Sequence, residues 1–213
     1  MSGIGLSGAH RTGKSTLAKA FAEAFGIKYV ASVTSDVIRG YGLDPADDCD
    51  FDLRLRIQWE ILRVHELAYV ETKGMFITDR TPLDFLAYTL ADVTRDNLTF
   101  EQGEELMRYK SACIGVINKH FNVLTVIQPG IEFIEAPGKP RNNRAYSDHI
   151  NAIICGLASA EKDIGITTTY LPKHLLDINA RVAAIESSVH MAFNKFERNA
   201  AKRGAIRASS AVH

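Results

Sequence analysis

Short runs of apolar residues alternate along this chain with longer stretches in which apolar residues recur every three or four positions. The runs predict five β-strands, at residues 4–6, 28–33, 75–78, 123–127 and 166–171. The periodic stretches predict helices: one carries Leu17, Phe21 and Phe25 and ends at Gly26, and others cover residues 34–39, 51–73, 82–90, 100–119, 146–162 and 175–198. Strands separated by helices pair in parallel through right-handed crossovers. We therefore expect a five-stranded parallel sheet flanked by helices, in one domain spanning residues 1–198. Residues 199–213 are expected to form a flexible basic tail.

Residues 8–15 match the pattern G-x-x-x-x-G-K-[ST], and a predicted strand and a predicted helix flank them. In such a loop, successive backbone N–H groups surround nucleotide phosphates, and the glycines allow close approach. The lysine, Lys14, reaches the β- and γ-phosphates, and the Ser15 hydroxyl ligates Mg²⁺. The N-terminus of the following helix adds its own attraction for anions. We predict a protein that binds ATP or GTP, with ATP as the expected donor and Mg²⁺ as the expected metal. The residues expected to contact them are Gly8, His10, Arg11, Thr12, Gly13, Lys14, Ser15 and Thr16.

The composition is ordinary for a globular enzyme, and it bears on which partners and which cellular compartment we expect. The 213 residues are 46% hydrophobic and 23% charged, and 25 basic side chains balance 25 acidic ones, so net charge gives no sign of a nucleic-acid partner. The three cysteines are far apart in sequence, which disfavours a disulfide framework or a zinc site. No secretion signal and no apolar run of about 18 residues is present. We expect a reducing, cytoplasmic setting and no membrane partner.

Asp79 and Arg80 follow the third predicted strand directly. In many motor and switch ATPases such a strand ends in Asp-Glu, where the glutamate activates water, but here an arginine follows the aspartate. An acid beside a fixed cation suits a different task, in which Asp79 faces the metal or an acceptor and Arg80 holds an anion. The alternative is a structural ion pair between these two side chains.

A short basic segment at about residues 129–145 is the second distinguishing feature. It contains Lys139, Arg141 and Arg144. Mobile arginines that close over a transferring phosphoryl group stabilise its charge and exclude water, which lets an acceptor compete with hydrolysis. The other interpretation is an ordinary solvated loop.

These features together resemble the small P-loop kinases related to nucleoside, nucleoside-monophosphate and nicotinamide-riboside kinases, which include phage-type AAA-like kinases. The resemblance covers residues 3–171 and rests on the phosphate loop, on residues 79–84 and on the basic lid. It implies a sheet of nucleoside-monophosphate kinase type with a short lid. It also implies an acidic residue facing the acceptor after the second strand, where Asp36 and Arg39 stand. Relatives commonly have Glu there, and Asp36 is also suited to stabilise the first turn of its own helix.

The sequence thus predicts a Mg²⁺-dependent phosphotransferase that moves the ATP γ-phosphoryl group to a nucleoside or a nucleoside monophosphate. Lys14, Asp36, Asp79, Arg141 and Arg144 are the expected catalytic residues, with Ser15 and Asp79 on the metal. The residues expected on the acceptor are Asp36, Arg39, Arg56 and Arg80.

Two other functions remain open. One is a kinase acting on DNA, at hydroxymethylated bases or ends, because five positive charges face one negative between Lys195 and His213. A solvated helix end is the plainer interpretation of that tail. The other is a nucleotide-sensing NTPase. The sequence gives no oligomeric state.

Overall fold

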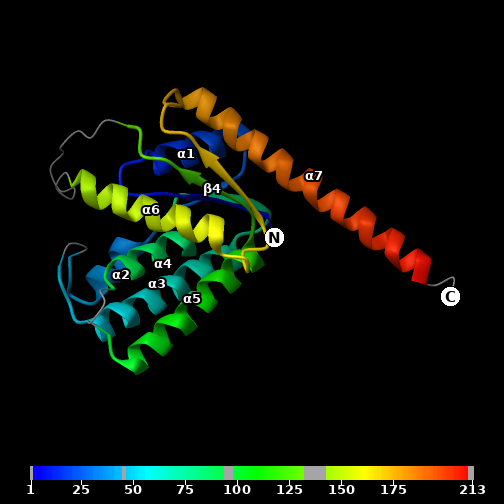
Figure 1. Cartoon of the computed structure of the whole chain (residues 1–213). Helices are drawn as coiled ribbons and strands as arrows, with labels where there is room; N and C mark the ends of the chain where they lie inside the picture. Colours follow the sequence, from blue (N-terminus) through cyan, green and yellow to red (C-terminus); the bar gives the residue numbers. More distant parts are fainter. Residues whose placement is uncertain (1, 45–46, 94–97, 132–142, 211–213) are drawn as a thin grey trace.

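The computed structural model describes residues 2–44, 47–93, 98–131 and 143–210, with side chains described from residue 3 to residue 198 within these ranges (Figure 1). Five parallel strands form one sheet, in the order β2-β3-β1-β4-β5. They are β1 (Ser2–Ser7), β2 (Lys28–Val30), β3 (Met75–Thr78), β4 (Phe121–Ile127) and β5 (Thr167–Leu171). The predicted five-stranded parallel fold is confirmed.

Helices cover both faces of the sheet, as the alternating pattern predicts. They are α1 (Lys14–Phe25), α2 (Thr34–Gly40), α3 (Phe51–Glu71), α4 (Pro82–Ala91), α5 (Phe100–His120), α6 (Arg144–Ala160) and α7 (Ile178–Ser210). One buried apolar cluster joins α3, α4, α5 and α6 to one face, and a second joins α1 and α7 to the other (Figure 1). Successive residues of β3 show the division, because Phe76 belongs to the first cluster and Ile77 to the second. The phosphate loop follows the central strand, β1, and so lies at the carboxyl end of a sheet that is covered on both faces.

Gly5 explains how α4 comes close to the phosphate loop. A Cβ atom at this position of β1 would lie 2.5 Å from the Leu124 side chain and 2.7 Å from the Thr81 methyl group. Only a residue without a side chain admits this packing. As a result, Thr81, the residue that caps α4, packs against the end of β1, and its hydroxyl lies 2.6 Å from the Ser7 hydroxyl.

The last helix differs from its prediction. We expected it to end near residue 198, but α7 continues to Ser210. Residues 199–210 include four alanines, two arginines and one lysine, which are strong helix formers and favour continuation of the helix. The far part of α7 runs away from the body of the molecule (Figure 1).

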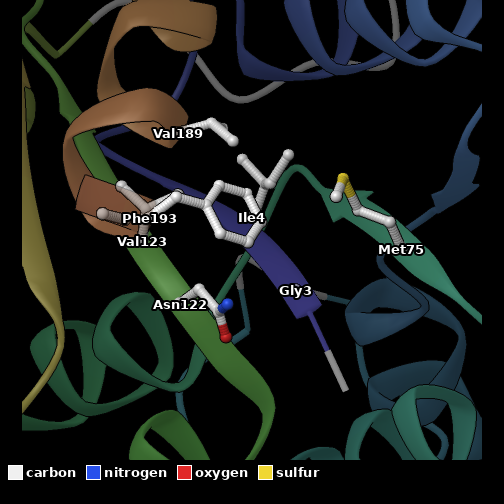
Figure 2. A pocket seen from close by; sticks show the side chains of 8 residues that line it. Gly3, Ile4, Met75, Asn122, Val123, Val189 and Phe193 are labelled. Carbon is white, nitrogen blue, oxygen red and sulfur yellow. The ribbon is translucent and has the colours of Figure 1, made fainter. Parts of the chain in front are cut away.

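Where α7 leaves the body, Val189 and Phe193 lie over Ile4 and Val123 (Figure 2). The apolar cavity between them has room for about 10 Å³, at most one water molecule. This cavity is too small for a nucleotide, and in parallel sheets flanked by helices ligands bind beyond the carboxyl ends of the strands. Among the described helices, none is both long enough and apolar enough to span a bilayer.

Candidate functional site

The phosphate loop takes the backbone shape that anion binding requires. Gly13 has φ 79°, and Arg11, with φ 59°, is the one non-glycine residue in the described ranges with a positive φ. Such left-handed residues turn successive N–H groups toward one concave side. The loop leads directly into α1, so the helix N-terminus also points toward that side.

Lys14 is buried within the loop. Its Nζ donates to the carbonyl oxygens of Gly8 and Ala9, each at 2.7 Å. Burial lowers the pKa of Lys14 to about 8, although the carboxylates of Asp84 and Asp79 act in the opposite direction. The amine is thus held by neutral carbonyls, which are weaker partners for a cation than phosphate oxygens.

Asp79 links the loop to the end of β2. The Ser15 hydroxyl donates to Asp79 Oδ2, and the Ser32 N–H donates to Asp79 Oδ1 at 3.1 Å. The sequence predicted that Ser15 and Asp79 bind the same metal ion. In the structure their side-chain oxygens are in contact. A hydroxyl and a carboxylate oxygen are hard ligands of the kind that hydrated Mg²⁺ takes, so this donor set fits that ion.

His65 of α3 holds the other side of this connection, a role that the sequence did not reveal. Its Nδ1–H donates to the Ile61 carbonyl at 2.8 Å, which leaves Nε2 to accept from the Val33 N–H at 3.3 Å and the Ser32 hydroxyl at 3.2 Å. Burial lowers the pKa of His65 and favours this neutral ring. The backbone that presents its N–H to Asp79 is therefore fixed from α3.

Asp84 is a further residue of the site, to which the sequence assigned no role in binding or catalysis. The side chain is fully buried, and its two oxygens accept from the Gly8 N–H at 2.9 Å and the Thr81 N–H at 3.0 Å. The spacing Thr81-x-x-Asp84 was a visible signal, because it matches a capping box. Its contact with Gly8, 76 residues away, was not visible.

Arg80 lies beside the phosphate loop and does not pair with Asp79. Its Nη2 donates to His10 Nδ1 at 3.1 Å, and the guanidinium stands 5.0 Å from the centre of the Tyr88 ring. The His10 and Tyr88 rings are 4.8 Å apart, centre to centre. Burial and the nearby charge of Arg80 lower the pKa of His10 to about 3, so the imidazole stays neutral and accepts the hydrogen bond.

Arg181 is a further residue that no sequence pattern indicated. It comes from α7, is only 4% exposed, and donates through Nη2 to the Thr12 carbonyl at 2.7 Å. Burial lowers the pKa of Arg181. A cation is therefore bonded to the outer side of the phosphate loop.

The remaining predicted site residues lie outside this network. Asp36 and Arg39 pair with each other at 3.1 Å, and both are exposed on α2. Arg56 lines a surface hollow of about 460 Å³ between α3 and α5. Arg144 is exposed at the start of α6. No described hydrogen bond or ion pair joins any of them to the loop, and Lys139 and Arg141 lie outside the described residues. Their assigned roles stay predictions.

Comparison with known proteins agrees with this geometry. Residues 4–143 match the AAA domain family. Deoxyadenosine kinase from M. mycoides, solved with dCMP and dCDP, superimposes with a TM-score of 0.62 at 13% identity over 89% of this chain and 98% of that one. Thymidylate kinase from Candida albicans gives 0.61 at 15% identity over 91% and 92%.

The NadR protein in complex with NR gives 0.62 at 15% identity, over 90% of this chain and 50% of that one. At these identities the likeness concerns the fold, which is that of P-loop kinases and confirms the resemblance found in the sequence. Among curated proteins, none matches the sequence significantly.

Proposed function

The chain belongs to the AAA domain family, and on that premise we propose that it is an ATP-dependent kinase that phosphorylates a nucleoside or a nucleoside monophosphate. The loop N–H groups and Lys14 would bind the donor phosphates. Ser15 and Asp79 would hold Mg²⁺, which neutralises phosphate charge when it is bound. The fold shared with deoxyadenosine and thymidylate kinases supports the acceptor class.

One observation carries the choice of transfer over hydrolysis: the site pairs an arginine with carboxylates that are already occupied. Asp79 accepts from Ser15 and Ser32, and Asp84 accepts from Gly8 and Thr81. In the described part of the site, Asp84 is fully buried against backbone N–H groups and Asp79 is assigned to the metal, so we propose neither carboxylate as the group that activates water. Arg80, in contrast, is a fixed cation next to the loop, suited to a phosphate oxygen of the acceptor or of the transferring group.

On the acceptor side, we propose that Asp36 takes the proton from the acceptor. Arg39 and Arg56 join Arg80 as candidate ligands for an acceptor phosphate, which favours a monophosphate. Arg141 and Arg144 are proposed to close over the transferring group and exclude water. Replacing Asp36 with Asn tests the first of these roles, because it keeps the size of the side chain and removes the base.

The deciding experiment is a search for the phosphorylated product. The protein is incubated with Mg²⁺ and ATP or GTP and with nucleosides, deoxynucleoside monophosphates, nicotinamide riboside, or plain or hydroxymethylated DNA, and products are identified by mass. Transfer to a free nucleoside or nucleotide, abolished in Lys14→Ala, is the expected result. Nucleotide hydrolysis that no acceptor changes would contradict the proposal and favour a nucleotide-sensing NTPase.

A DNA acceptor is the second candidate, and the projecting end of α7 is the observation that favours it (Figure 1). Lys195 and Arg198 are exposed there, and three more basic residues follow in the sequence. Binding through DNA phosphates depends steeply on salt, whereas binding of a small acceptor in a pocket does not. The salt dependence of the acceptor KM therefore separates the two.

A further inference from the structure

His10 occupies a position that the phosphate-loop pattern leaves open, yet its described contacts all lead out of the loop. Nδ1 accepts from Arg80 at 3.1 Å, and the ring packs 4.8 Å from Tyr88 of α4. Arg80 in turn stands over the same Tyr88 ring, at 5.0 Å. Three side chains from the loop, the end of β3 and α4 therefore form one closed cluster beside the phosphate-binding backbone.

We propose that His10 is a positioning residue, which fixes the direction of the Arg80 guanidinium for phosphoryl transfer. This inference rests on the proposed kinase function. It adds a role to a loop residue beyond the phosphate contacts made by the backbone.

The two contacts of Arg80 restrain it in different ways. The face of Tyr88 limits the tilt of the planar guanidinium, and the hydrogen bond to His10 limits its rotation within that plane. A guanidinium has donors only, so this bond needs a lone pair on the imidazole. A neutral His10 supplies it, and a protonated ring would not.

Fixed direction matters because another cation is close. The charge of Arg80 acts on the Lys14 amine and lowers its pKa, and like charges push a mobile guanidinium away. Donors stabilise a transition state well only when they are already aimed at the place where charge develops. Without His10, Arg80 would keep its charge and lose this orientation.

Two variants distinguish the contribution of the Nδ1 lone pair of His10 from that of its aromatic ring. His10→Phe keeps an aromatic ring next to Tyr88 and removes the acceptor, whereas His10→Asn keeps an oxygen near the place of Nδ1. With dAMP, dCMP, dGMP and dTMP as acceptors, we expect His10→Phe to lower kcat/KM about tenfold to a hundredfold. We expect His10→Asn to stay within about threefold of the wild type.

A double-mutant cycle shows whether the effect passes through Arg80. In an Arg80→Ala background, His10→Phe should change kcat/KM by less than about threefold. Additive losses would overturn the proposal, because His10 would then act independently of Arg80. An equal loss of Mg-ATP affinity in His10→Phe would overturn it too, since the residue would then shape the phosphate loop itself.

An NMR measurement tests the positioning without any turnover. In the wild type, ¹⁵N spectra should show the Nε2–H tautomer of His10 and separate, slowly exchanging Nη signals for Arg80. These signals should average in His10→Phe and return in His10→Asn. Equal restraint of Arg80 in His10→Phe refutes the positioning role. If the wild type phosphorylates no acceptor, the proposed function fails, and the spectra still decide whether His10 orients Arg80.

Discussion

At the scale of single residues, the site is built from buried polar groups whose charge is expensive. Lys14 is the clearest case, because its amine is buried against carbonyl oxygens and its pKa is lowered to about 8. A lowered lysine pKa means that folding opposes the charged form. Below pH 8 the amine is nevertheless charged in both states, so the folded protein carries this cost at neutral pH. Under the proposed function, anionic phosphates would offset this cost, because they are stronger partners for the amine than neutral carbonyls.

Lys14→Ala should therefore separate activity from stability. We expect turnover to fall by about 10²–10³-fold or more, because a donor to the transferring phosphate is lost. The melting temperature without nucleotide should not fall, and the stabilisation by Mg-ATP should disappear. Lys19→Ala, at an exposed position on the same helix, is the matched control. Thermal unfolding with and without Mg-ATP checks both statements, and unchanged turnover would show that the site is misplaced.

His65 makes stability depend on pH. Its pKa is lowered from 6.5 by burial, so the unfolded chain binds a proton more readily than the folded protein does. Stability is then complete above pH 6.5 and is lost as the pH falls below that value. The pKa of His10, about 3, acts in the same direction. Urea midpoints at pH 7, 6 and 5 should fall in the wild type and fall less steeply in His65→Gln. His190→Gln, an exposed histidine on α7, should keep the wild-type slope.

At the scale of elements, two helices are attached to the phosphate loop through single side chains. Asp84 ties the start of α4 to Gly8, and Arg181 ties the start of α7 to Thr12. The loop is thus supported on both faces of the sheet. Its shape depends on the docking of these helices as well as on its own glycines.

Two aspartates only five residues apart should therefore respond differently to the same substitution. Asp84→Asn leaves a buried amide against the Gly8 and Thr81 N–H groups, so we expect a loss of about 1–3 kcal/mol in the free energy of unfolding. Asp79→Asn should change that free energy by less than about 1 kcal/mol, while raising the Mg²⁺ concentration needed for turnover. Denaturant unfolding and Mg²⁺ titrations of both variants provide the comparison. A large loss of stability in Asp79→Asn, together with a changed Mg²⁺ requirement in Asp84→Asn, would mean that Asp79 is the structural residue and Asp84 the metal ligand.

Arg181→Met tests the attachment of α7. Loss of the bond to the Thr12 carbonyl should weaken Mg-ATP binding by about tenfold, because the loop backbone loses a charged partner. The acceptor KM should change little. Arg198→Met, at an exposed position of the same helix, is the control. Calorimetric titration with Mg-ATP gives the two affinities, and equal values would mean that Arg181 only fastens α7.

The sequence was sufficient for the elements but not for these attachments. The apolar runs and the residues that end helices predicted the five strands, and a local motif predicted the loop with Lys14 and Ser15. Strands and loop were predictable because each is encoded within a few neighbouring residues. Arg181 meets Thr12 across 169 positions, and His65 meets Val33 across 32. Such pairs depend on how helices dock, which single-chain periodicity does not specify. Asp84 lies between these cases, since its capping pattern is local and its contact with Gly8 is not.

At the scale of the whole molecule, charge is distributed unevenly even though its sum is zero. The end of α7 is basic, so the rest of the chain is acidic by the same amount. The helix leaves the body beyond Phe193, and its described side chains after that residue, up to Arg198, belong to neither buried cluster. The basic residues at the end of α7 are therefore relevant to whether the acceptor is DNA, and not to the stability of the fold.

Removing residues 199–213 tests what this segment does. We expect the melting temperature to stay within about 2 °C and transfer to a free nucleoside or nucleotide to be unchanged, because the buried clusters stay intact. A DNA acceptor gives a different result. The deletion removes three basic residues, so the slope of log affinity against log salt should become shallower by up to about 3. DNA binding measured between low and physiological salt, for the full chain and the shortened one, distinguishes these cases. An unchanged slope would leave α7 as a solvated helix end and restrict the acceptor to small molecules.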